Sequence, residues 1–454
     1  MRWTEPIFRS FRLDPQGLKS GDLRTYLLRA ATGTFVLRIG STVLLFITSI
    51  FLARMLGTAG FGAYANGRAW LRLACVLAGF GFPGLLIRQT AVYRAGGQWG
   101  LFRGMIRFSG MVSLANAVVL MACGLLLGWV LYGPEDIIML HTFWIALLAL
   151  PLVVMMQLEE AAISGFKRVI LGQLADTMCR PMLFLAIVGI MYLVFTSELN
   201  APLVMASQVV TAFLALILGT YWFHKVVSGP VDKAVPIEYR PREWLSTAMP
   251  LLFVSGMYVV TSRSSLVILG AMEGAEAAGI YKAALRGAEL LIFPMFAISK
   301  PFQPLVASLY AEGAKERLQH IVTNWTRLAF FVSIPLAIGF WGWGDLFLSI
   351  FGSEFIKGHT TLSILSIGRI IGIGTGMAAL LLNMSGNEKE SAIGMGLGAI
   401  LNIVLCFLFI PYWGTVGAAA AESVSSLFWN AFLVVKVLQR MDIHPTVLGK
   451  IRCG

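Results

Sequence analysis

Long apolar stretches, separated by short polar segments, make up most of this sequence. Twelve of them approach the roughly 20 mostly apolar residues that a membrane-spanning helix needs. They cover residues 34–53, 66–87, 108–131, 141–162, 173–195, 202–224, 246–269, 280–304, 328–350, 360–382, 393–410 and 415–437. The pattern predicts an all-α polytopic membrane protein with about twelve transmembrane helices, because a helix satisfies its own backbone polar groups within lipid.

The polar segments between these stretches alternate in charge. Residues 1–33, 88–107, 225–244 and 439–454 hold 17 of the 35 Lys and Arg residues, whereas the alternate segments are short and poorer in them. The positive-inside rule therefore places the basic segments and both termini in the cytoplasm. The segments expected outside are 132–140, 196–201, 270–279 and 351–359.

A long polar segment between two stretches divides the chain into halves. It covers residues 225–245, contains three prolines and follows the sixth stretch. Six helices on either side give both halves the same orientation, so we expect two pseudo-symmetric six-helix lobes around a central cavity. The expected divisions are a basic cytoplasmic segment 1–33, a first lobe 34–224, the linker 225–245, a second lobe 246–438 and a cytoplasmic tail 439–454. The first segment fits an amphipathic helix on the membrane surface or a disordered tail equally well.

A short motif occurs once in each half. Gly57 and Gly62-x-Tyr64 return 217 residues later as Gly274 and Gly279-x-Tyr281. Each copy joins two apolar stretches, which predicts a tight hairpin between two membrane helices. Glycine permits a positive φ and a close approach of helices. The tyrosine that follows suits the membrane–water boundary.

Composition agrees with a membrane protein and excludes several functions. The chain is 57% hydrophobic and 13% charged, against about 25% charged residues in a soluble domain. The net charge of +12 is explained by cytoplasmic segments, so we expect no nucleic-acid partner. The cysteines and histidines lack metal-ligand spacing, and no P-loop, HExxH or GxSxG motif occurs. We therefore expect no metal, no cofactor and no enzymatic activity.

Ionisable residues inside the apolar stretches are the candidate functional residues, because a charge within lipid costs about 2.5 kcal/mol or more. Arg263 is flanked by hydroxyl side chains, and Arg369 lies beside glycines spaced four apart. The two hairpins are each followed by two basic residues with i, i+4 spacing, which share one helix face. The candidate cavity cations are Arg68, Arg72, Arg263, Lys282, Arg286 and Arg369.

Each of these assignments has a structural alternative. Arg369 could belong to an ion pair, Arg263 could extend outward to the membrane surface, and Glu289 could neutralise Arg286. Asp176 and Arg180 have the spacing of an intrahelical salt bridge. The carboxylates that are candidates for ion coupling are Asp176, Glu289 and Glu422, the last being the lone carboxylate of its stretch.

Five segments carry a family resemblance in the right order. They are LARMLGTAGFGAY (52–64), GFPGLLIRQ (81–89), GAEAAGIYKAA (274–284), FGSEF (351–355) and GTVGAAAAESVSS (414–426). The chain resembles the Wzx-type polysaccharide flippases of the multidrug/oligosaccharidyl-lipid/polysaccharide exporter superfamily. That resemblance implies a V-shaped cavity that opens alternately to the two sides of a bacterial inner membrane. It also implies a cargo of polyprenyl-diphosphate-linked oligosaccharide, such as an O-antigen, exopolysaccharide or capsule repeat unit. Membrane lipids and polysaccharide polymerase or export machinery would be the partners.

The charges within the stretches favour this function over two others. A diphosphate headgroup needs fixed cations, and arginine binds phosphate oxygens in bidentate fashion. A multidrug or cation antiporter of the same superfamily should instead have a carboxylate-rich cavity. A membrane enzyme such as a glycan ligase should have a large outer loop. Because the deepest charges here are arginines and the outer segments are short, we expect a flippase driven by membrane potential or an ion gradient.

Overall fold

The computed structural model describes residues 20–133, 136–194, 199–227, 235–295, 306, 309–310 and 312–449. Every regular element in these residues is a helix. The first half contains α2 (Ser20–Gly79), α3 (Phe82–Ala95), α4 (Trp99–Tyr132), α5 (Ile137–Leu148), α6 (Leu150–Gly165), α7 (Val169–Leu174), the π-helix η2 (Ala175–Cys179), α8 (Arg180–Val194) and α9 (Ala201–Val227). The second half contains α10 (Pro241–Leu291), α12 (Lys315–Ser349), the 3-10 helix η3 (Ser353–Gly358), α13 (His359–Gly374), α14 (Ala378–Met384) and α15 (Glu388–Met441).

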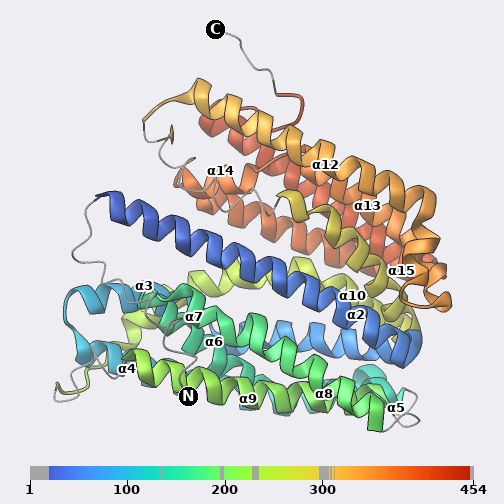
Figure 1. Ribbon diagram of the computed structural model, residues 1–454, viewed down its shortest axis with the longest axis horizontal. Coiled ribbons are helices and arrows are strands. Elements are labelled where there is room, and N and C mark those ends of the chain that lie inside the picture. The colour runs from blue at the N-terminus through green and yellow to red at the C-terminus, as the bar shows by residue number, and fades with distance from the viewer. Residues whose placement is uncertain are drawn as a thin grey trace.

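Among the described residues, eight helices are long and apolar enough to cross a membrane, or nine if the bent pair Ser353–Gly374 and Ala378–Met384 is one span. Three of them run to 41, 55 and 54 residues, about twice the length that one crossing needs. Each of these three contains a glycine with non-helical backbone angles, namely Gly57, Gly274 and Gly414. The chain is therefore an all-helical, multi-pass membrane protein, and α2 visibly runs to one end of the molecule and returns (Figure 1).

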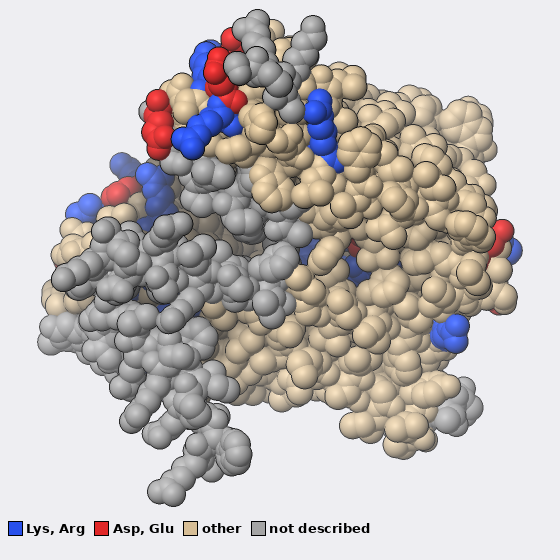
Figure 2. Space-filling model, turned by 45° about the horizontal axis from the view of Figure 1, so that its top comes forward, with Lys and Arg blue, Asp and Glu red and all other residues tan. Residues whose placement is uncertain are grey.

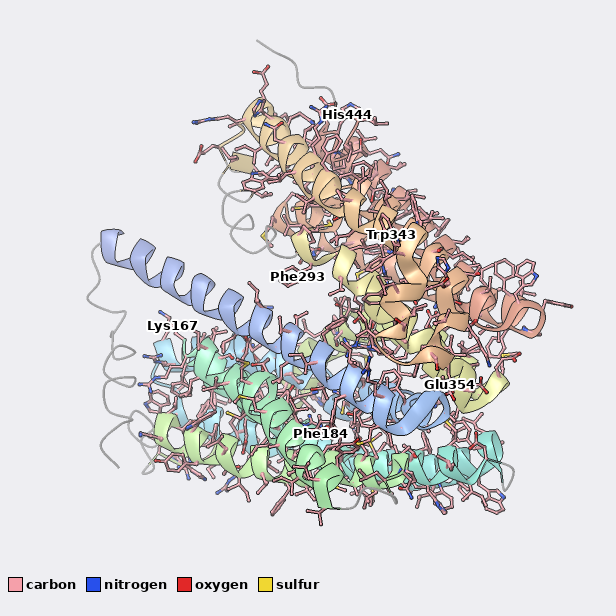
Figure 3. All side chains as sticks on the ribbon, turned by 45° about the vertical axis from the view of Figure 1, so that its right-hand side comes forward. Lys167, Phe184, Phe293, Trp343, Glu354 and His444 are labelled. Atoms are coloured by element: carbon pink, nitrogen blue, oxygen red, sulfur yellow. The ribbon has the colours of Figure 1, made fainter. Side chains whose placement is uncertain are left out.

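The helices form two bundles that meet at one end and diverge at the other (Figure 1). We call α2–α9 the N-terminal bundle and α10–α15 the C-terminal bundle. The hairpin end is the end that carries Gly57 and Gly274, and the open end is the opposite one. Glu354 lies at the hairpin end, whereas Lys167 and His444 lie apart from each other toward the open end (Figure 3).

The distribution of buried residues explains this shape. One apolar core contains residues of both bundles. Phe61 of α2 and Tyr281 of α10 belong to the part of this core near the hairpins. At the open end each bundle has a separate core: Phe82, Phe102 and neighbours in the first, and Leu318, Leu381 and neighbours in the second. Close van der Waals packing drives helix association in lipid, so the shared core holds the bundles together at the hairpin end.

Two glycines allow the bundles to approach closely there. A Cβ on Gly62 would lie 1.8 Å from the carbonyl oxygen of Ala275, and one on Gly279 would lie 2.0 Å from that of Thr58. The turns themselves use Gly57 and Gly274, whose φ angles are +66° and +79°, a region that glycine enters without strain. Each repeat thus supplies one turning glycine and one packing glycine.

The long α10 begins on the N-terminal bundle and ends in the C-terminal one. Trp244 and Ala248 belong to the open-end core of the N-terminal bundle, and Trp244 Nε1 donates to the hydroxyl of Tyr93 at 2.9 Å. Helix α9 extends to Val227, and α10 already begins at Pro241. The polar segment between the halves is therefore short in the structure, with residues 228–234 outside the described part.

Two of the expected helices are broken. The stretch 66–87 contains a break between α2 and α3, where Phe80 and Gly81 both have positive φ. The stretch 360–382 bends by 42° between α13 and α14. The break contains Gly376, which has a φ of +77° and packs against the carbonyl of Pro445. An apolar run predicts the length of a crossing but not a local break in it.

Candidate functional site

Basic side chains from both bundles gather between them. Arg68 and Arg72 lie on the returning half of α2, and Arg263 and Arg286 lie on either side of the turn in α10. Electrostatic interactions link Arg263 with Arg68, Arg72 and Arg286. Figure 2 shows a few blue side chains set back in the surface beside tan residues. The predicted cations of the two hairpin helices therefore face each other.

In the N-terminal bundle a carboxylate holds two of the cations. Asp176 accepts a hydrogen bond from Arg180 Nη1 at 3.0 Å and lies 3.8 Å from Arg72 Nη2. The intrahelical salt bridge expected from the spacing is present, although it spans a π-helical turn. Arg180 Nη2 also donates to Gln208 Oε1 at 3.3 Å. Asp176 is thus occupied by two arginines from different helices.

In the C-terminal bundle Glu289 lies between two cations, as Asp176 does in the N-terminal bundle. It accepts from Arg286 Nη1 at 2.8 Å, and its other oxygen lies 3.7 Å from Lys282 Nζ. Arg286 Nε donates to Ser49 Oγ of α2 at 3.1 Å, which links the two bundles. Glu289 therefore neutralises Arg286, as the structural alternative in the sequence analysis stated.

Arg369 is not a free cavity cation. It forms an ion pair with Glu422, and that carboxylate also accepts a hydrogen bond from the Tyr281 hydroxyl. The pair forms because α13 packs tightly on α15: a Cβ on Gly368 would lie 2.5 Å from Ser423 Oγ. Glu422, the lone carboxylate of its stretch, thus has a partner from a helix that lies 53 residues earlier in the sequence.

The hairpin tyrosines are buried inside the protein, which the sequence did not predict. Tyr64 is 3% exposed and Tyr281 fully buried. Gln208 Nε2 donates to the Tyr64 hydroxyl at 2.8 Å, just as Tyr281 contacts Glu422. A buried tyrosine needs a partner for its hydroxyl, and in each bundle the last helix supplies it. The partner is neutral in the first bundle and acidic in the second.

Together these groups form one electrostatically connected set, which we call the inter-bundle cluster. Its basic members are Arg68, Arg72, Arg180, Arg263, Lys282, Arg286 and Arg369, and its acidic members are Glu160, Asp176, Glu289 and Glu422. Seven cations against four carboxylates leave a formal excess of three positive charges. Such a set attracts an anion strongly where water is scarce. The described residues contain no group of His, Cys, Asp and Glu that could hold a metal.

A family model described as polysaccharide biosynthesis protein matches residues 27–299, which is more than half of the chain. The chain belongs to this family. A second model, described as MatE, matches residues 250–408. The flippase family that the motifs indicate is thereby confirmed, and the chain is a membrane transporter rather than an enzyme.

Curated relatives of this family member include three archaeal-source proteins. The "Probable low-salt glycan biosynthesis flippase Agl15" of Haloferax volcanii is 22% identical over 88% of this chain and 81% of its own length. The "Probable flippase AglR" of Haloferax volcanii is 26% identical over 38% of this chain, and the "Uncharacterized membrane protein MJ1068" of Methanocaldococcus jannaschii is 25% identical over 37%. The chain spans only about a third of the length of these last two, 37% and 35% respectively.

Solved structures show the same fold. An inward-facing MATE family multidrug resistance transporter of the MOP superfamily has a TM-score of 0.73 at 13% identity, covering 90% of this chain and 98% of its own. A MOP superfamily transporter from Pyrococcus furiosus, described by the reverse polarity of its binding pocket, has a TM-score of 0.64 at 14% identity, covering 92% and 95%. The polysaccharide biosynthesis family member thus has a MATE-like fold.

Sequence reasoning missed two members of the site in this family member. Arg180 was assigned only to a salt bridge, and Gln208 was not singled out. Gln208 could have been found from the repeat, because Gln208 and Glu422 lie near the same place in the last apolar stretch of each half. A buried hydrogen-bonded group around Asn402, with Ser264 and Ser265 of α10, was also missed.

Proposed function

We propose that this chain is a flippase that moves a polyprenyl-diphosphate-linked oligosaccharide across the membrane by alternating access. The observation that carries the proposal is the positive excess of the inter-bundle cluster within otherwise apolar helices. A diphosphate diester carries two negative charges, and its passage through a low-dielectric region requires cations that replace its water. The names of the two Haloferax relatives as flippases support the same function.

The architecture fits this transport cycle. If each of the three overlong helices supplies two crossings and the bent pair of α13 and α14 supplies one, there are twelve crossings in two six-helix lobes. The open end carries basic residues such as Arg94 and Lys167, and by the positive-inside rule it faces the cytoplasm with both termini. The hairpin end, closed by the Gly62 and Gly279 contacts, then faces outward. In this arrangement cargo enters from the inner leaflet of the cytoplasmic membrane.

The carboxylates of the cluster have a role in the empty state. Asp176, Glu289 and Glu422 each hold at least one cation, which reduces repulsion among the basic side chains until cargo arrives. A phosphate that takes over one of these cations leaves a carboxylate without its partner in a region of low dielectric, where it favours protonation or a bound cation. These three residues are therefore the candidates for ion coupling.

A multidrug or cation antiporter is the second candidate, because the MatE model matches part of the chain and the fold is shared with multidrug transporters. The charge of the cluster argues against it. A cationic drug placed beside seven basic side chains would be repelled, and like charges in a low dielectric interact over several ångströms with energies of a few kcal/mol. The chemistry of the site thus favours an anionic cargo.

Reconstitution tests the proposal. The purified full chain is placed in liposomes that contain a fluorescent lipid-diphosphate-linked sugar, and a membrane-impermeant quencher reports which leaflet holds the fluorophore. We expect the protein to move the lipid between leaflets faster than protein-free liposomes do. A lipid-linked sugar with a neutral linkage is the matched control cargo and should not be moved.

Two results would contradict the proposal. Movement no faster than in protein-free liposomes, at either sign of an imposed membrane potential, would exclude flippase activity for this cargo. Accumulation of a cationic dye against a proton gradient, without movement of the diphosphate lipid, would favour the antiporter instead.

A further inference from the structure

The last described residues of the chain, 442–449, turn back from α15 and pack on the open end of the C-terminal bundle. Asp442 ends α15 with a φ of +56°. Ile443 is fully buried in the open-end core of this bundle, and His444 lies toward the open end (Figure 3). We call residues 442–449 the C-terminal strap, because they are part of the packed bundle.

Three side chains of α12 bind the main chain of the strap. Gln319 exchanges two hydrogen bonds with the backbone of His444, at 2.7 and 2.8 Å. Thr326 donates to a strap carbonyl at 3.2 Å. Arg327 Nε and Nη2 donate to two more, at 3.0 and 3.2 Å, and bonds from a charged donor are the stronger ones. A polar face of α12 thus holds the strap in one fixed path.

The strap also bonds to the break between α13 and α14. The N–H of Val447 donates to the carbonyl of Gly374, the last residue of α13, at 3.0 Å. In a continuous α-helix this carbonyl would accept from the N–H of residue 378 instead. Gly376 within the break has a φ of +77°, and a Cβ there would lie 2.0 Å from the carbonyl oxygen of Pro445. The strap therefore takes both the acceptor and the space next to the break.

The docked strap and a continuous helix exclude each other at this carbonyl. Once the strap leaves, the carbonyl of Gly374 has no donor in the bundle except the N–H that a helix would supply. A buried carbonyl without a donor is costly, so release of the strap favours a continuous helix. Segments with two discrete arrangements of this kind are the usual elements of a conformational switch.

We propose that the C-terminal strap is a latch on this span: docked, it holds α13 and α14 bent, and released, it lets them join into one helix. Its role in transport rests on the proposed function. A change at the break reaches the inter-bundle cluster directly, because α13 carries Arg369. The partner of that arginine, Glu422, lies on α15, the helix from which the strap extends.

Hydrogen–deuterium exchange of the full chain in detergent tests the latch without any cargo. Gly376→Ala disfavours the positive φ and places a methyl group against the strap. We expect exchange of the amides in 443–449 to rise at least about tenfold, and exchange in 375–378 to fall as helical bonds form there. Gly386→Ala is the matched control, because Gly386 has a φ of +78° with nothing within 4 Å of a Cβ; it should change neither segment.

Arg327→Gln releases the strap from the other side and leaves the break itself unaltered. It should give the same opposite changes, faster exchange in 443–449 and slower exchange in 375–378, while Arg327→Lys should give a smaller effect because a charged donor remains. Unchanged exchange in the strap, or faster exchange in both segments, would show a structural brace and overturn the latch.

A disulfide tests whether release is needed for transport. A Cβ on Gly374 would lie 3.9 Å from Val447 Cγ2, close enough for cysteines at the two positions to bond. In a variant without the native cysteines, Gly374→Cys/Val447→Cys should move the fluorescent lipid-linked sugar at least about tenfold more slowly when oxidised. A reductant should restore the rate, and either single cysteine variant should transport equally under both conditions.

Failure of the latch and failure of the proposed function are distinguishable. Full transport by the oxidised double-cysteine protein would overturn the latch and leave flippase activity standing. If the unaltered protein moves no lipid, the proposed function fails, while the exchange measurements still decide whether the strap holds the span bent.

Discussion

At the scale of single residues, the cations of the cluster differ in how deeply their acidic partners are buried. Arg369 has an acidic partner that is only 9% exposed, so removal of the arginine leaves a buried carboxylate without compensation. Breaking a buried pair in this way destabilises proteins by about 3–5 kcal/mol. Arg263, by contrast, interacts electrostatically with Glu289, and that carboxylate keeps Arg286 and Lys282 as partners when Arg263 is removed.

Substitution of Arg369 should therefore affect the fold before it affects transport. We expect Arg369→Ala to lower both the melting temperature of the detergent-purified protein and its yield. The double variant Arg369→Ala/Glu422→Gln should recover much of this loss, because the stranded charge is gone and a glutamine can still contact Tyr281, as Gln208 contacts Tyr64. Thermal unfolding curves measure both effects.

Arg263→Ala is the matched comparison for this prediction. It should leave the melting temperature close to that of the unaltered protein while reducing transport per inserted molecule. An Arg369→Ala protein with an unchanged melting temperature and abolished transport would instead make Arg369 a direct cargo ligand.

At the scale of the helical elements, the two hairpins use glycine for two separate tasks. Gly57 and Gly274 turn the chain with positive φ, whereas Gly62 and Gly279 let α2 and α10 touch through their backbones. Small residues at helix contacts are a general means of association in membranes, where apolar side chains gain little from leaving lipid. The repeat is therefore visible in packing as well as in sequence.

Enlarging either packing glycine should disrupt assembly to a similar degree. Gly62→Leu and Gly279→Leu each place atoms where the other helix's backbone carbonyl lies, so we expect both to reduce folded protein in the membrane and to broaden its gel-filtration profile. Gly339→Ala is the control, because nothing lies within 4 Å of a Cβ there and alanine favours a helix. Tolerance of one leucine variant and loss of the other would show that the two contacts are not equivalent.

At the scale of the whole molecule, the shape follows from where the apolar cores are shared. The bundles have a common core near the hairpins and separate cores at the open end. Hydrogen bonds also join the bundles at the hairpin end, where Arg54 Nε donates to the carbonyl of Ile350 at 2.7 Å and Thr58 donates to Glu354 at 3.3 Å. Transport requires a motion in which the hairpin end opens and the opposite end closes.

Chemical labelling should show which end faces the outside. In a variant without the native cysteines, Ser353→Cys at the hairpin end should react with a membrane-impermeant maleimide in intact cells. Gln98→Cys at the open end should react only after the membrane is permeabilised. Both positions are exposed, so lack of access means the wrong side of the membrane. The reverse labelling pattern would invert the proposed orientation and the direction of cargo entry.

The sequence by itself determined that the chain is a membrane transporter built from helices, because the length of an apolar stretch and the asymmetry of Lys and Arg are properties of neighbouring residues. It also located the repeat and the cations near it. Breaks such as that at Gly376 escaped it, because they depend on a contact with Pro445, far along the chain. Only the tertiary structure decided which cations are paired, since Glu422 reaches Arg369 and Tyr281 through packing between α10, α13 and α15. The same packing buried the hairpin tyrosines, because the partners of a buried side chain come from helices that lie far apart in the sequence.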